Sequence, residues 1–180
     1  RMFRRERQLL AALDHPNIAR LIDGGVTAQG LPYLVLEYVD GVPITQYCRD
    51  QRTSLRERVR LAGDVCRAVE HAHRAMIVHR DIKPANVLVT AEGEVKLLDF
   101  GVAKLLQADN YRTQTVDAFM TPEYAAPEQV RRGGDSPALD VYALGVVLHE
   151  LILGVRPERH SPMRPSRLIT PSTATVADPS

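Results

Sequence analysis

The chain has 180 residues, of which 44% are hydrophobic and 25% charged, and its formal net charge is +1. These values are typical of a folded domain with a sizeable core. The low net charge gives no electrostatic reason to expect binding to nucleic acid or to an anionic membrane. Its two cysteines, Cys48 and Cys66, form no Cys-x-x-Cys pair, which suits a reducing compartment. We therefore expect a cytoplasmic chain with no nucleic-acid partner, although a longer parent protein could carry a membrane anchor.

The first part of the chain predicts a helix, a hairpin and a second helix. Residues 1–14 read as the middle of an amphipathic helix, and the β-prone stretches 18–23 and 33–39 as a hairpin. Residues 54–76 form the clearest helix, which starts at a capping box of Ser54 and Glu57. The apolar residues expected on its buried face are Leu55, Val59, Ala62, Cys66, Val69 and Met76.

The second part predicts another hairpin, another helix and a tail. Residues 87–90 and 95–98 flank the turn AEGE and favour a hairpin. Ser136 and Pro137 occupy the N-cap and first-turn positions of a further helix. The apolar run 141–154 is too short to span a bilayer and predicts a buried core helix, so we expect no membrane segment in this chain. Residues 157–180 are rich in Pro, Ser and Thr without periodicity and predict a disordered tail.

Polar groups gather in the stretch VHRDIKPANVL, residues 78–88, whose spacing fits neither a strand nor an amphipathic helix. Because the predicted hairpin is antiparallel, Asn86 before its first strand and Asp99 after its second return to the same end. An amide oxygen and a carboxylate together suit Mg²⁺. Asp81 could act there as a proton acceptor, and Lys83 could balance phosphoryl charge.

The motif HRDIKPAN, followed by DFG at residues 99–101, resembles the eukaryotic-type (Hanks-type) serine/threonine protein kinases. The surrounding sequence resembles bacterial members of that family. The resemblance continues from about residue 3 to 157 through YLVLEYVDG, TPEYAAPE and LDVYALGVVLHELILGVRP. It implies a protein-kinase-like α+β fold, with a remnant of the small β-rich N-lobe and a mainly helical C-lobe. Its implied domains are a partial N-lobe in 1–39, a C-lobe core in 40–156 and the tail in 157–180.

Catalytic and metal-binding roles follow from this resemblance. Asp81 is implied to be the catalytic base that accepts the proton of a protein serine or threonine hydroxyl, and Lys83 to contact the γ-phosphate of ATP. Asn86 and Asp99 are implied to hold Mg²⁺, with Mn²⁺ as an alternative.

The resemblance also implies a set of nucleotide-binding positions. Leu36 would be the gatekeeper of the adenine pocket, and Glu37 and Val39 would offer backbone groups to adenine. Leu88 is implied to line the same pocket. Glu6 is implied to pair with a phosphate-binding lysine.

Regulatory positions complete the implied set. Thr121 would help to define the hydroxyl substrate, although Met120 beside it departs from the glycine expected there. Thr113 and Thr115 are implied phosphorylation sites whose phosphate would dock on Arg80, with a homodimer as the setting for trans-autophosphorylation. A regulatory stack is implied at the positions Leu10, Leu21, His79 and Phe100, with Asp140 anchoring the loop around His79.

The sequence contains no GxGxxG and no VAIK-like stretch. We therefore expect a partial catalytic domain without the glycine-rich loop, the strand-three lysine and the last C-lobe helices, and little activity from these residues alone. A pseudokinase or binding module without phosphotransfer is the alternative. A small-molecule phosphotransferase is the third reading, and TPEYAAPE argues against it.

Overall fold

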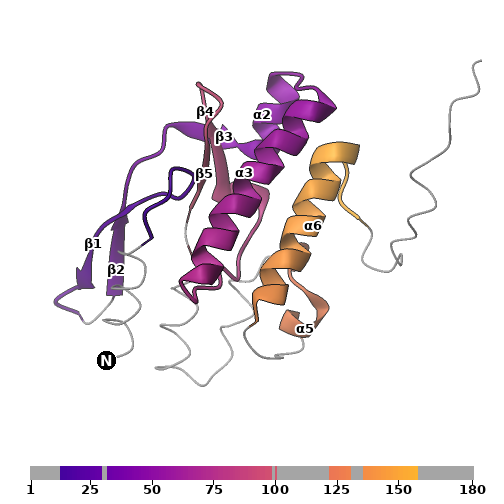
Figure 1. Cartoon of the computed structure of the whole chain (residues 1–180). Helices are drawn as coiled ribbons and strands as arrows, with labels where there is room; N and C mark the ends of the chain where they lie inside the picture. The colour runs from indigo at the N-terminus through magenta and orange to yellow at the C-terminus, as the bar shows by residue number, and fades with distance from the viewer. Residues whose placement is uncertain (1–12, 30–31, 99, 101–121, 131–135, 158–180) are drawn as a thin grey trace, which may run out of the picture.

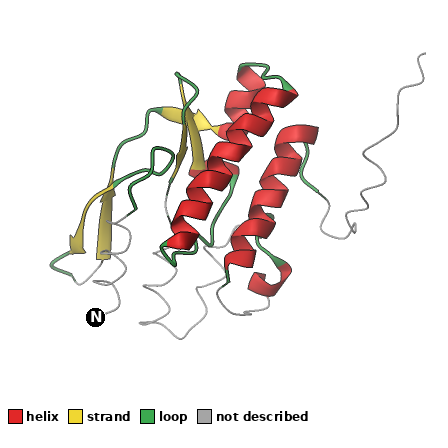
Figure 2. Ribbon diagram, viewed as in Figure 1, coloured by secondary structure: helices red, strands yellow, loops and turns green. Residues whose placement is uncertain are grey.

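The computed structural model describes residues 13–29, 32–98, 100, 122–130 and 136–157. Two small antiparallel sheets occupy one side of the molecule and the long helices the other (Figures 1 and 2). The helix predicted for residues 1–14 and the tail predicted for 157–180 fall almost wholly outside the described residues. The described elements, in chain order, are β1 Leu21–Val26, β2 Pro32–Leu36, β3 Gly41–Pro43, α2 Ile44–Asp50, α3 Leu55–Arg74, the 3₁₀ turn η1 Pro84–Asn86, β4 Val87–Thr90, β5 Val95–Leu97, α5 Pro127–Val130 and α6 Pro137–Leu153.

The first predicted hairpin is present, but its first strand begins later than expected. β1 pairs antiparallel with β2, and the register shifts between Leu21 and Asp23. Residues 18 and 19, predicted to start this hairpin, run instead beside β5, together with Asn17. There Ala19 N donates to Leu97 O (2.9 Å) and Leu97 N donates to Asn17 O (2.8 Å). The chain before β1 is thereby tied to the second sheet.

The second predicted hairpin, β4 with β5, is confirmed, and it carries a third strand that the sequence did not signal. β3 pairs antiparallel with β4 through Gly41 opposite Thr90 and Pro43 opposite Leu88. A Cβ on Gly41 would lie 2.8 Å from Val89 O, so the two backbones approach too closely for any side chain at this position. Three residues with a glycine and a proline are too short a run for a strand to be predicted.

Helix α3 begins as predicted but buries a different face. Ser54 Oγ accepts from Glu57 N (3.2 Å), whereas the Glu57 carboxylate pairs with Arg60 instead of closing the capping box. The expected face is wrong in four of its six members, because Leu55, Val59, Cys66 and Met76 are exposed. The stripe that is buried consists of Leu61, Ala62, Asp64, Val65, Ala68, Val69 and Ala72. Its alanines are small enough to allow close packing against α6 and β5, and this tertiary contact decides between two stripes of similar spacing.

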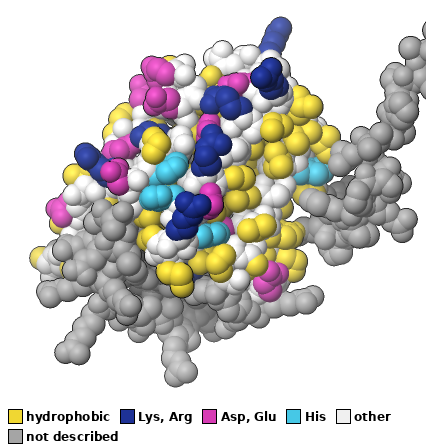
Figure 3. Space-filling view, viewed as in Figure 1, with side chains coloured by type: hydrophobic (Ala, Val, Ile, Leu, Met, Phe, Trp, Pro, Cys, Tyr) yellow, Lys and Arg dark blue, Asp and Glu magenta, His cyan; other side chains and the backbone are white. Residues whose placement is uncertain are grey.

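Helix α6 has the predicted caps, but it is not buried all round. Ser136 Oγ accepts from Ala138 N (3.2 Å), and Gly154 ends the helix in the left-handed conformation with φ of 74°. One face packs against α3, and apolar side chains on the other remain exposed, including Val141 at 62% and Leu153 at 46%. Hydrophobic side chains gather on this side of the molecule (Figure 3). The prediction of a buried core helix is therefore correct for one face only.

The core joins the second sheet to the helices. Among its fully buried members are Ile44 of α2, Leu61 of α3, Val87 of β4 and Leu97 of β5, while Leu151 brings in α6. Among the described residues, none of the helices is both long enough and apolar enough to cross a membrane.

Candidate active site

The loop between α3 and β4 brings three of the predicted site residues together. Asp81 Oδ2 lies 2.9 Å from Lys83 Nζ, and Asn86 Nδ2 donates to the same oxygen (3.0 Å) and to Asp81 O (2.8 Å). The 3₁₀ turn η1, with Pro84 at its start, folds the chain back so that position 86 reaches position 81. The side chains of Asp81 and Lys83 keep 17% and 22% exposure, so this carboxylate is accessible to another molecule.

A buried carboxylate beneath this loop fixes its backbone. Asp140, near the start of α6, is 1% exposed and accepts from His79 N and Arg80 N at 2.8 Å each. His73 Nε2 of α3 lies 2.7 Å from its Oδ2. Buried carboxylates need such partners, which agrees with the structural role expected for Asp140.

The backbone of Arg80 is in an uncommon conformation. Its φ is +67°, in the left-handed region that a residue with a side chain rarely adopts. Asp140 holds its N–H, and Gln129 Nε2 of α5 donates to its carbonyl (2.9 Å). Contacts from two different helices therefore maintain a backbone turn directly before Asp81.

His79 is wholly buried and joins the loop to the second sheet. Its Nδ1 accepts from Asp81 N (3.2 Å), which places the ring hydrogen on Nε2 for donation to Leu98 O (2.8 Å). The ring packs on Phe100 at a centroid distance of 4.8 Å. These contacts agree with a structural role for His79, and they orient the backbone of Asp81 directly.

The donor chemistry around Asn86 fits a hard divalent cation. The amide nitrogen of Asn86 is bonded to Asp81, and its remaining polar atom, the amide oxygen, is of the type that such a cation prefers. Leu98 N donates to Asn86 O (2.8 Å), so the chain arrives beside Asn86 one residue before Asp99, as the antiparallel hairpin predicts. Asp99 itself is outside the described residues, and within them no group of three or more His, Cys, Asp or Glu side chains could hold a metal ion.

The nucleotide-side candidates lie on β2, on the segment after it and on β4. Glu37 N donates to Arg20 O (2.9 Å), which ties the segment after β2 to the chain before β1. The Glu37 carboxylate pairs with Lys96 Nζ (2.8 Å), and this hydrogen bond lowers its pKa. Leu88 is half-buried opposite Lys96, and Val39 is half-buried after β2.

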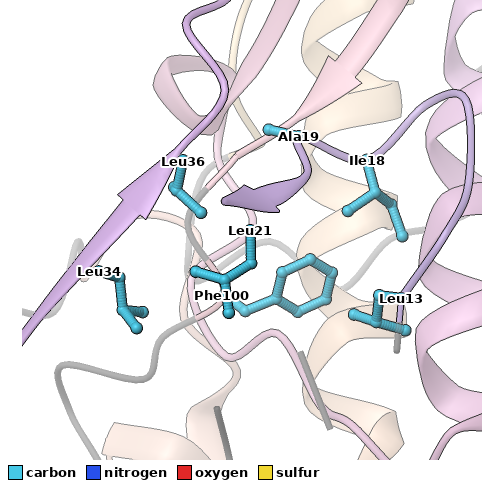
Figure 4. A pocket seen from close by; sticks show the side chains of 7 residues that line it. All are labelled: Leu13, Ile18, Ala19, Leu21, Leu34, Leu36 and Phe100. Atoms are coloured by element: carbon cyan, nitrogen blue, oxygen red, sulfur yellow. The ribbon is translucent and has the colours of Figure 1, made fainter. Parts of the chain in front are cut away.

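A small apolar cavity lies behind Leu36. Its volume is about 20 Å³, and its lining is formed by Leu13, Ile18, Ala19, Leu21, Leu34, Leu36 and Phe100 (Figure 4). Two members of the predicted stack, Leu21 and Phe100, meet there, and Phe100 continues to His79.

Six of the predicted positions fall outside the described residues: Glu6, Leu10, Asp99, Thr113, Thr115 and Thr121. Two further residues that support the loop, His73 and Gln129, were not predicted from the sequence. The spacing of His73 from Asp140 in sequence is too large for any local pattern to signal the contact.

A further contact missed from the sequence joins the segment before α5 to α6. Tyr124 OH donates to Glu150 Oε2 (2.6 Å), and burial together with this bond raises the pKa of the phenol. The Arg156 guanidinium carbon lies 5.8 Å from the Tyr124 ring centroid. The segment 122–126 is therefore attached to the same helix that anchors the loop of Asp81.

Comparison with known proteins adds an independent result. The model of the family described as protein kinase domain matches residues 1–170. Serine/threonine-protein kinase PknB of Mycobacterium leprae is 39% identical over 86% of this chain, which covers 26% of that protein. PknB of Mycolicibacterium smegmatis is 41% identical over 86% of the chain and 26% of that protein. PknA of Mycobacterium tuberculosis is 44% identical over 86% of the chain and 37% of that protein. The chain thus spans about a quarter to just over a third of these relatives, and it belongs to the protein kinase domain family.

Proposed function

We propose that this chain forms the catalytic centre of a protein serine/threonine kinase. The supporting observation is the convergence of Asp81, Lys83 and Asn86 within 3.0 Å contacts on a loop whose backbone is fixed by the buried Asp140. The relatives named serine/threonine-protein kinase support the same reaction class. In this proposal Asp81 accepts the proton of a protein serine or threonine hydroxyl while that oxygen takes the γ-phosphoryl group of ATP.

Each residue of the loop has a separate role in the proposal. Lys83, which lies 2.9 Å from Asp81, would contact a phosphoryl oxygen and neutralise charge next to the base. Asn86, through its amide oxygen, and Asp99 would hold Mg²⁺ or, as the alternative, Mn²⁺. The metal would supply charge neutralisation on the triphosphate when bound.

The remaining predicted positions enter as parts of the same proposal. Leu36, the Glu37 carbonyl, Val39 and Leu88 would bind adenine, and Glu6 would pair with a phosphate-binding lysine. Residues 1–39 would belong to the N-lobe, 40–156 to the C-lobe core and 157–180 to a tail. The proposed compartment is the cytoplasm, where ATP is present.

A pair of carboxylate substitutions in the full-length protein tests the division of roles. Asp81→Asn removes the proton acceptor and should lower turnover by about 10²–10⁴-fold with little change in ATP affinity. Asp99→Asn should weaken Mg²⁺-dependent ATP binding, because it removes a charge from the metal site. Turnover and nucleotide binding would be measured separately. Equal ATP affinity and equal residual rate in the two variants would contradict the assignment.

Regulation by phosphorylation is the second test. We infer that Thr113 or Thr115 is autophosphorylated, with Arg80 as the docking cation and Thr121 at the substrate hydroxyl. A phosphate adds about −1.5 to −2 charges and could form one to three charge-assisted hydrogen bonds. Mass spectrometry after incubation with ATP should find phosphate on one of these two threonines. A double alanine variant that phosphorylates substrate at the wild-type rate would refute the switch. An autophosphorylation rate per enzyme molecule that rises with enzyme concentration would support the homodimer.

A further inference from the structure

A surface groove lies on the side of the second sheet, between the segment after β2, helix α2 and the β4–β5 turn. Its volume is about 490 Å³, and no residue of the loop 79–86 lines it. β3 and α2 approach the β4–β5 turn at the top of the molecule in Figure 1. The groove is thus bordered by three separate parts of the chain.

The charge of the groove is negative. Four carboxylates line it, and the only cation among the described lining residues is Lys96, which already pairs with Glu37 at 2.8 Å. The other three carboxylates of the lining, those of Asp40, Asp50 and Glu92, belong to exposed residues. The hydrogen bond from Thr90 lowers the pKa of Glu92, so this carboxylate is ionised at neutral pH. Acidic side chains gather near the β4–β5 end of the molecule (Figure 3).

One of these carboxylates lies where its charge does not favour its own helix. Asp50 is the last residue of α2, so its charge lies at the helix end that favours cations. The presence of an aspartate at position 50 is therefore not explained by the stability of α2.

Aromatic surface accompanies the carboxylates. Tyr38 is 89% exposed, which is unusual for a large aromatic side chain, and Tyr47 of α2 also lines the groove. Aromatic faces beside carboxylates bind guanidinium and ammonium groups by combining cation–π attraction with charge-assisted hydrogen bonds. The composition of the groove therefore complements a chain that carries basic and apolar side chains.

We propose that this groove docks a basic, extended peptide segment of a protein substrate, separate from the residue that is phosphorylated. That the bound segment belongs to a substrate rests on the proposed kinase function, whereas the binding of a basic peptide to the groove does not. β4 starts beside Asn86 and reaches the groove at Thr90, three residues later, which is a distance of about 10 Å along the strand. A segment held in the groove would therefore keep its attached protein close to Asp81 and raise its local concentration there.

Direct binding without nucleotide tests the groove. The probe is a fluorescein-labelled peptide of alternating arginine and leucine, and its anisotropy is followed as the protein is added. The wild-type protein should bind it, and more weakly as salt rises from about 0.05 to 0.5 M. An equally long peptide of glutamate and leucine should not bind. The double variant Asp50→Lys, Glu92→Lys should raise the Kd at least tenfold.

Matched controls separate the groove from general charge. Glu94→Lys makes the same change of charge as the single variant Glu92→Lys, on the same turn, but it lies outside the lining. It should leave the Kd within about twofold of wild type, whereas Glu92→Lys alone should raise it. Asp50→Lys places a favourable charge at the end of α2, and Glu92 is exposed, so both substitutions should fold; circular dichroism checks this. Tyr38→Ala provides an uncharged test and should also weaken binding.

The outcomes are distinct from those of the proposed function. Absence of peptide binding, or equal losses in Glu94→Lys and in the double variant, would overturn the groove even if the protein phosphorylates substrates. Groove-dependent binding by a protein without phosphotransfer would instead support the docking site and count against the kinase proposal.

Discussion

Removal of the Asp140 carboxylate should destabilise the protein more than removal of any carboxylate on its surface. The side chain is 1% exposed and receives two backbone N–H groups, from His79 and Arg80, together with His73 Nε2. Asp140→Ala leaves these groups without their acceptor in a site that water does not reach. Asp140→Asn keeps one acceptor oxygen and replaces the other by an amide nitrogen, which repels a neighbouring N–H.

The magnitude follows from the number of groups affected. A buried donor that loses its acceptor costs about 1–3 kcal/mol, and removal of one partner from a buried charged network costs about 3–5 kcal/mol. We therefore expect about 3–5 kcal/mol for Asp140→Ala and a smaller loss for Asp140→Asn, since one bond is retained. The left-handed backbone at Arg80 adds to the loss, because Asp140 is one of its supports.

Equilibrium urea unfolding monitored by circular dichroism measures these losses. The matched control is Glu70→Ala on α3, since Glu70 forms an ion pair with Arg74 of its own helix, and these two side chains are 60% and 74% exposed. Such pairs contribute about 0–1 kcal/mol. If Asp140→Ala lost no more stability than Glu70→Ala, the anchoring of the loop by Asp140 would be refuted.

Two further predictions concern stability. Gly41→Ala should lower the free energy of unfolding by about 1–3 kcal/mol, because its Cβ would lie 2.8 Å from Val89 O and the strands would have to separate. The control Gly63→Ala inside α3 meets nothing closer than 3.6 Å and should be neutral or stabilising. Thermal unfolding of both variants measures the difference. Burial, followed by the nearby His71 and Arg67 of α3, lowers the pKa of His15 from 6.5. The unfolded form therefore takes up this proton first as pH falls, and the stability of the protein should decrease below about pH 6.5. His15→Asn retains an acceptor for Asn17 N and cannot titrate, so it should flatten the urea midpoint between about pH 5 and 7; an unchanged pH profile would contradict this.

Features with a local signal were predicted well. The hairpin of β4 and β5 follows from two β-prone runs around a turn, and the caps at Ser54 and Ser136 follow from side-chain chemistry at a helix start. The placement of Asp81 at the same site as Asn86 was expected from the polar stretch that contains both. It is realised by a 3₁₀ turn that fixes their separation.

Features decided by distant contacts were not predicted. The stripe containing Leu55 and Val59 has the same spacing as the one containing Leu61 and Val65, and only the packing of α6 and β5 selects the second. Strand β3 exists because Gly41 lets its backbone meet β4, which no three-residue pattern indicates. The contact of His73 with Asp140 spans 67 positions in the sequence, so neither residue signals the other.

The supports of the candidate loop come from elements that do not themselves carry its reactive groups. Helix α6 holds the backbone before Asp81 through Asp140, and helix α5 holds Arg80 through Gln129. The residue directly after β5, Leu98, accepts from His79 through its carbonyl. Because Asp81 N is itself bonded to His79 Nδ1, displacement of any of these elements moves the base relative to Asn86. The position of the proposed catalytic carboxylate is therefore a property of how the helices pack on the second sheet. For this reason a substitution in the buried part of α6 should change the chemistry of a loop that lies 60 residues away in sequence.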